Sequence, residues 1–144
     1  MKQFVFFICI LFLTINHVQA AGSDSAPEVA KPSSYKKVLS MIKKEQFADA
    51  ITELEKILTN TNYANDPDIL NHYAYSLRKT QNLIKAEEYY KKALSIDPGH
   101  RGALEYIGEL YVDTNRLDLA NVTLKKLENC RCEEYAELKS YINK

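Results

Sequence analysis

Small and apolar residues recur at a spacing of 34 residues in the second half of this 144-residue chain. Tyr90 follows Ala86 at four residues, Ala93 follows it at seven and Pro98 at twelve. One period later the same offsets carry Ala120, Leu124, Leu127 and Cys132. A fixed period of 20 to 50 residues indicates a repeat architecture, in which each unit buries its apolar face against the next.

The residues inside each period predict two antiparallel helices. Ala74 and Gly108 are small at equivalent positions of the first helix, where a partner helix would cross closely. Asp66 and Pro67 match an N-cap followed by a proline at the first helical position. Four tyrosines fall at helical positions that predict burial in the core: Tyr73, Tyr90, Tyr106 and Tyr111.

These positions resemble the tetratricopeptide-repeat (TPR) family, over roughly 110 residues from about residue 33 to the end. The resemblance implies an all-α fold, a short solenoid of about three helix-turn-helix repeats across residues 33–132. The repeats are expected at about 33–64, 67–98 and 101–132. In residues 133–144, Tyr135, Leu138 and Tyr141 recur at a three-residue spacing among acids and lysines, and this segment is expected to form the capping helix that a solenoid needs.

The N-terminus has the layout of a secretory signal peptide, predicted for residues 1–20. Lys2 supplies a positive start and residues 4–15 a short apolar run, which is too short for a comfortable membrane span. Val18 and Ala20 place small residues before a cleavage site. Cleavage there predicts an exported protein that makes no membrane contact afterwards.

The segment 21–32, rich in serine, alanine and proline, is expected to be a flexible leader. Because the signal holds one lysine and no acid, 19 basic residues become 18 against 19 acidic ones, a net charge of −1. This balance argues against a nucleic-acid partner, which usually needs a basic stripe. A similarity to small secreted TPR proteins of Gram-negative bacteria implies the periplasm.

TPR arrays usually bind peptides on a concave side that is lined by the first helix of each unit. Tyr35 and Leu39 would lie at one end of that surface. The candidate binding residues carried over by position are Asn71, Tyr75, Arg78, Glu105, Glu109 and Asp113. The first three share one helical face, and the three carboxylates share another. Such a groove would hold an extended peptide, with Asn71 pairing its backbone; alternatively, Arg78 simply bridges to Glu105 or Glu109 between the units. The surface is too acidic to clamp a C-terminal carboxylate.

Cys130 and Cys132 are the only cysteines that remain after signal removal. An oxidising compartment favours a local disulfide that fixes the turn into the last helix. Two alternatives stay open. One is a soft-metal site that adds His100 or Glu133, although two thiolates do not complete a tetrahedral set. The other is redox exchange or an intermolecular bridge.

Catalytic chemistry finds little support in the sequence. Neither His72 nor His100 has a serine or cysteine at a spacing that suggests a triad, and the four glycines form no phosphate loop. No catalytic residue, cofactor or metal is therefore predicted. The function expected is a non-enzymatic adaptor that binds a protein or peptide of the cell envelope. A thiol- or metal-handling protein built on Cys130 and Cys132 is the alternative, and the oligomeric state is left open.

Overall fold

The computed structural model describes residues 30–144, so the predicted signal peptide and most of the predicted leader lie outside the described residues. The seven helices of this part are α1 (Ser33–Lys43), α2 (Phe47–Leu58), α3 (Pro67–Lys79), α4 (Leu83–Ile96), α5 (Arg101–Asp113), α6 (Leu117–Leu127) and α7 (Glu133–Ile142). The first six form three helix hairpins and the seventh stands alone at the end. The predicted all-α class and the short solenoid with a final helix are confirmed.

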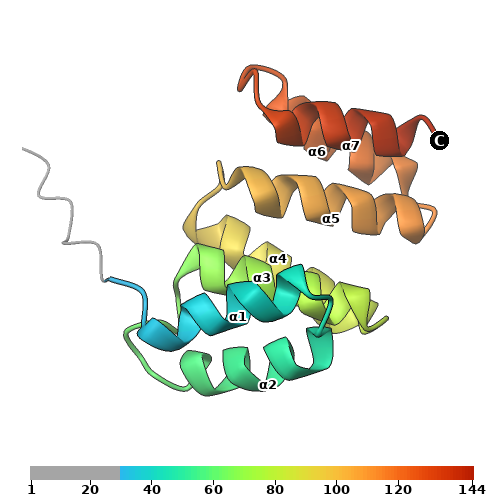
Figure 1. The fold of residues 1–144 in the computed structure, drawn as a ribbon. Helices are drawn as coiled ribbons and strands as arrows, with labels where there is room; N and C mark the ends of the chain where they lie inside the picture. The colour runs from blue at the N-terminus through green and yellow to red at the C-terminus, as the bar shows by residue number, and fades with distance from the viewer. Residues whose placement is uncertain (1–29) are drawn as a thin grey trace, which may run out of the picture.

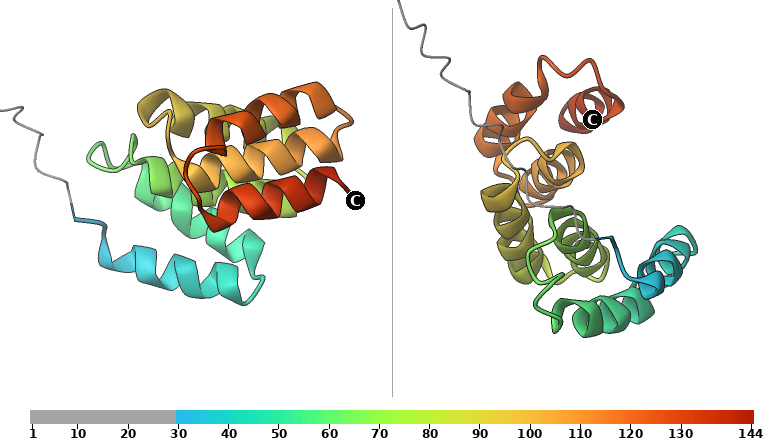
Figure 2. Two further views of the ribbon diagram at one scale, coloured as in Figure 1. Left: turned by 90° about the horizontal axis from the view of Figure 1, so that it is seen from above. Right: turned by 90° about the vertical axis from the view of Figure 1, so that its left-hand side faces the viewer.

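The hairpins stack side by side, each against the next (Figure 1). Seen from the side, the stack is an arc with α2, α4 and α6 along its outer edge and α1, α3, α5 and α7 along its inner edge (Figure 2). The inner helices therefore line a concave face. Within residues 30–144, no helix combines the length and the apolar character that crossing a membrane would need.

Side-chain caps fix where α3 and α5 begin. The Oδ1 atom of Asp66 accepts a hydrogen bond from the backbone N–H of Ile69 at 3.0 Å, and Pro67 occupies the first helical position, as predicted. At the start of α5, Nδ1 of His100 accepts from the N–H of Ala103 at 3.0 Å. Each cap satisfies one of the backbone N–H groups that a helix start leaves without a partner.

The three turns inside the hairpins share one backbone conformation. Glu45, Gln81 and Asn115 all have positive φ angles, of 59°, 65° and 57°. The N–H after each of them bonds back into the helix that has just ended, which closes the helix with a left-handed residue. A left-handed conformation costs a residue with a Cβ atom roughly 1–2 kcal/mol, so this turn is set by the packing of the two helices.

Small residues let the helices approach closely. Ala74, Ala86 and Ala120 have no exposed surface. A Cβ atom on Gly108 would lie 2.6 Å from the Cδ2 atom of Leu138, which is the buried anchor of α7. The predicted close crossing at Gly108 is therefore the place where α7 packs on α5. Any larger residue there would push α7 away from α5.

Two expectations about tyrosines are wrong. Tyr106 is only half-buried, because its position on α5 faces the space between α3 and α7, whereas Tyr73, Tyr90 and Tyr111 are buried as predicted. Tyr35 is 6% exposed and its hydroxyl hydrogen-bonds Nδ1 of His72 at 2.6 Å. It joins α1 to α3 and is not part of an open binding surface.

Candidate binding groove on the concave face

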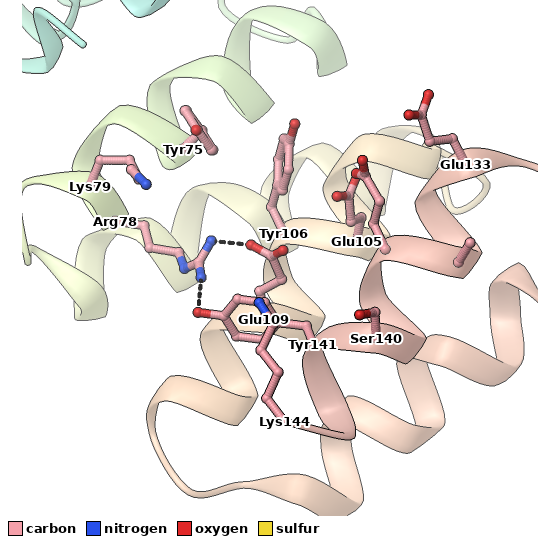
Figure 3. A pocket seen from close by; sticks show the side chains of 12 residues that line it. Tyr75, Arg78, Lys79, Glu105, Tyr106, Glu109, Glu133, Ser140, Tyr141 and Lys144 are labelled. Atoms are coloured by element: carbon pink, nitrogen blue, oxygen red, sulfur yellow. Dashed lines mark hydrogen bonds and ion pairs between the residues drawn. The ribbon is translucent and has the colours of Figure 1, made fainter.

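A groove of about 710 Å³ lies on the concave face between α3, α5 and α7. Tyr75 and Arg78 line it from α3, and Glu105 and Glu109 line it from α5, so the structure brings four of the six predicted residues together (Figure 3). Helical spacing of four and seven residues is what places these side chains on one face of each helix. The volume falls in the range of roughly 300–1,000 Å³ that is usual for ligand sites.

The other two predicted residues lie elsewhere. Asp113 borders a neighbouring smaller hollow, together with Arg78 and Tyr141. Asn71 is 4% exposed and sits against Gly102 of α5, and its Oδ1 atom has no hydrogen-bond partner among the described residues. Asn71 thus lies at the contact between the two helices and does not line the groove.

The groove also has a third wall that sequence reasoning missed. This wall is formed by α7 and the short segment after it, through Glu133, Glu137, Ser140, Tyr141 and Lys144. Their spacing of four, three, one and three residues places them on one side of a helix. That spacing is visible in the sequence, but treating this segment only as a polar cap hid its inward face.

Arg78 is the centre of an ion-pair network at one end of the groove. Its guanidinium donates to Oε2 of Glu109 and, at 2.7 and 3.0 Å, to Oδ2 of Asp113. A further bond reaches the hydroxyl of Tyr141, which itself donates to Oδ1 of Asp113 at 2.7 Å (Figure 3). The Arg78 side chain is 8% exposed. It bridges the two units through Glu109, and it makes no ion pair with Glu105.

The charge state of Arg78 follows from these contacts. Burial acts to lower its pKa, but the hydrogen bonds and charges of Asp113 and Glu109 outweigh burial, so the pKa lies above its ordinary value. The guanidinium is therefore charged at every accessible pH. Removing either side of such a buried, hydrogen-bonded pair leaves an uncompensated charge.

The opposite end of the groove is acidic. Glu105 is 3% exposed and faces Glu137 on α7. Burial, followed by the hydrogen bond and the charge of Glu137, raises the pKa of Glu105 to about 9, with smaller contributions from Glu109 and Glu134. Glu105 therefore binds its proton more tightly than a free glutamate does, and the two carboxyl groups can share that proton in a hydrogen bond.

Two tyrosines separate the ends of the groove. The ring centroids of Tyr75 and Tyr106 are 4.8 Å apart, and Phe47 packs edge-on against Tyr75 at 5.8 Å. Burial raises the pKa of both tyrosines, so both hydroxyls stay neutral. Lys79 stands over Phe47 and Tyr75, with its amino nitrogen 5.8 Å from each ring centroid.

The two cysteines lie at the entrance to α7. Their sulfur atoms are within bonding distance and their Cα atoms are 5.1 Å apart, a separation suited to a disulfide. Arg131 between them has a left-handed backbone, with φ of 51°. His100, the ligand considered for a metal, instead hydrogen-bonds Oδ1 of Asp68 at 2.9 Å and caps α5. Across residues 30–144, no three His, Cys, Asp or Glu side chains converge in a way that could hold a metal ion.

Comparison with known proteins agrees with this architecture. Residues 67–100, which span α3, its turn and α4, match the family model of the tetratricopeptide repeat. Residues 67–100 thus match one TPR unit, and the hairpins on either side have the same helix-turn-helix arrangement. No curated protein matches the chain in sequence.

Among solved structures, 28 chains match. One belongs to a structure described as the CopN-Scc3 complex, with 18% sequence identity and a TM-score of 0.60. The match covers 76% of this chain and 64% of that one, so this chain spans less than two thirds of the length of that relative. At this identity the likeness extends to the fold and no further.

Proposed function

We propose that this protein is a non-enzymatic adaptor that binds a protein or peptide partner in the concave groove between α3, α5 and α7. The observation that carries the proposal is the groove itself. Three inner helices expose tyrosine and charged side chains there, next to an apolar contact between Tyr75 and Tyr106. Tyrosine is among the residue types that are enriched in protein interfaces and at their energetic hot spots.

The similar solved structure also supports a protein partner. Its description names a complex of two proteins, CopN and Scc3, and one of its chains shares the fold of this protein. Fold likeness is an associational argument for function, because one fold serves many purposes. The groove chemistry is what makes the argument specific to this chain.

The cell envelope is the proposed location, and the proposal rests on the sequence of the first twenty residues. A close pair of cysteines suits an oxidising compartment. Expression in a Gram-negative host followed by fractionation and intact mass measurement tests the location. A periplasmic product beginning at Ala21 is expected, whereas a cytoplasmic product that retains residues 1–20 would refute it.

The binding proposal is tested by affinity capture from an envelope extract. Lys79 and Glu137 both line the groove and are exposed, so the double variant Lys79→Glu/Glu137→Lys inverts the groove charges without touching the Arg78 network. Glu88→Lys/Lys125→Glu makes the matched change on exposed positions of α4 and α6, which line the outer edge of the arc.

A partner captured by the native protein and by the outer-face variant, and lost by the groove variant, is the expected result. Circular dichroism confirms that all three proteins are folded. Equal capture by the groove variant would move the binding surface away from the concave face and refute the proposal.

A further inference from the structure

Three carboxyl groups lie at one end of the groove without a counter-charge. Glu105 comes from α5, and Glu133 and Glu137 come from the first two turns of α7. In the part of the chain that the structure describes, none of the three takes part in an ion pair. The cations that line the groove, Arg78, Lys79 and Lys144, gather at its other end (Figure 3).

Glu105 adds a second observation, because it is buried and still lines the groove. With 3% of its surface exposed, the side chain makes no hydrogen bond to an amide, hydroxyl or cationic group of residues 30–144. Its close polar neighbour is Glu137, another carboxyl. The Glu105–Glu137 pair has no cation of its own, so an ionised carboxylate there is costly until a ligand brings positively charged hydrogen-bond donors.

The surroundings of the carboxyl groups specify which donors fit. The Tyr106 ring stands beside Glu105 at the acidic end (Figure 3), and the Tyr75 ring packs against it with 4.8 Å between the two centroids. A guanidinium group stacks on aromatic rings through its flat face and donates up to five N–H groups in its plane, so it can reach carboxylates on two different helices. A compact ammonium group lacks the flat face.

We propose that the acidic end of the groove binds the side chain of an arginine residue in an extended segment of the partner protein. Glu105 and Glu137 accept its N–H groups, and the Tyr106 ring lies against the plane of its guanidinium. This inference rests on the proposed function and names the chemistry of the partner. It assigns the arginine to one end of the groove, opposite Arg78.

The proposed contact is linked to pH. The titratable and charged groups that surround Glu105 or line the groove around it come from all three helices and the residue after α7: Tyr75, Arg78 and Lys79 on α3, Tyr106 and Glu109 on α5, Glu133, Glu134, Glu137 and Tyr141 on α7, and Lys144. Because the pKa of Glu105 is raised in the free protein, an arriving guanidinium ionises this carboxyl and releases its proton. Binding of arginine therefore strengthens as pH rises from 6 to 8.

A titration followed by NMR tests the proposal on the purified protein. The probes are the capped tripeptide Ac-Ala-Arg-Ala-NH2, the same peptide with citrulline in place of arginine, and free L-arginine. Citrulline keeps the shape of the side chain and removes its charge. Glu105→Gln and Glu137→Gln are the groove variants, and Glu88→Gln, on the exposed face of α4, is the matched control.

The arginine peptide is expected to bind with a dissociation constant on the order of 1 mM and to shift the signals of Tyr75, Tyr106 and Glu137. The citrulline peptide, and the arginine peptide with either groove variant, should bind at least about tenfold more weakly. The control should bind like the native protein. Affinity should rise between pH 6 and pH 8 in the native protein and stay flat in Glu105→Gln.

Several results would overturn the inference. If the arginine and citrulline peptides bind equally well in the groove, the groove does not recognise the charge of arginine. That result would refute the inference and leave the proposal of a peptide-binding groove unaffected. Tighter binding of free L-arginine than of the capped peptide would show that its terminal groups are recognised. Binding by no probe would also refute the inference, and partner capture that depends on the groove would then still support the adaptor function.

Discussion

The two ends of the groove contain similar side chains in opposite situations. At one end Arg78 is held by Glu109, Asp113 and Tyr141, so every charge in that network has a partner inside the protein. At the other end Glu105 and Glu137 face each other without a cation. Helical spacing alone makes both ends look equally suited to a ligand. The difference teaches that a charged residue that lines a groove can already be paired within its own fold, and that the groups without a counter-charge are the ones free to bind a charged partner.

The largest effect is expected from Arg78→Met. This change leaves Glu109 and Asp113 without their cation, so the free energy of unfolding should fall by about 3–5 kcal/mol. Urea unfolding measures it. Lys79→Met, on the next and exposed residue, is the control and should stay within about 0.5–1 kcal/mol of the native protein. Similar losses in the two variants would mean that the ion-pair network does not set Arg78 apart from its exposed neighbour.

At the acidic end, removing an ionisable group is expected to raise the free energy of unfolding instead of lowering it. The pKa of Glu105 is raised to about 9, so the folded state holds this proton more tightly than the unfolded state does. Its contribution to stability is fully present below the ordinary pKa of glutamate and is lost as pH rises through about 9. Glu105→Gln lacks this loss, and should exceed the native protein in stability by on the order of 1–3 kcal/mol at pH 8.

Thermal unfolding at pH 4 and pH 8 checks this second prediction. The two proteins should be nearly equal in stability at pH 4, where both side chains are neutral. Glu88→Gln, on an exposed position of α4, should show no pH-dependent gain. A gain of the same size at both pH values would mean that ionisation of Glu105 is not the cause.

A smaller effect is expected from opening the cysteine pair. In the oxidised protein this pair closes a three-residue loop at the start of α7, worth about 1–2 kcal/mol. Reduction should speed amide hydrogen exchange around Glu133 more than around Tyr141, which Arg78 and Asp113 continue to hold. The variant Cys130→Ser/Cys132→Ser should not respond to a reducing agent. Uniform change along α7 would contradict the prediction.

The smallest effect concerns the turn beside the Arg78 end. Gln81 is left-handed, with φ of 65°, so Gln81→Gly should raise the free energy of unfolding by about 0.5–1 kcal/mol. Asn115→Gly, at the equivalent turn, should gain less because asparagine tolerates this conformation. Urea unfolding compares them. Neither change alters a charge of the groove, so a change in partner binding would show that stability at this end also affects the acidic end.

The fold could be predicted because its determinants are local and periodic. The 34-residue spacing, the Asp66 cap with Pro67, and Gly108 each dictate a helix start or a close crossing from sequence alone. The groove walls on α3 and α5 followed from helical spacing. The α7 wall did not, because the cap faces the groove only through the packing of Leu138 on Gly108.

The pairing of charges could not be predicted for a related reason. Three carboxylates on α5 lie at intervals of four residues, and Glu105 or Glu109 was expected to pair with Arg78. The structure pairs Arg78 with Glu109 and with Asp113, one turn further along α5, because the choice depends on how the two hairpins are offset along their axes. Periodicity predicts on which face of its helix a side chain lies, but it does not predict which residue of the neighbouring helix that side chain contacts.

The hydrogen bond from Arg78 to Tyr141 joins residues 63 positions apart. In a linear array whose units touch only their neighbours, stability is a sum of separate units and interfaces, and an end unit can open alone. The Arg78 bond reaches past the third hairpin to the terminal helix and adds a second-neighbour coupling to that sum. Loss of the last helix therefore takes contacts from the middle of the array as well, and from α3 onward the protein should unfold as one cooperative block.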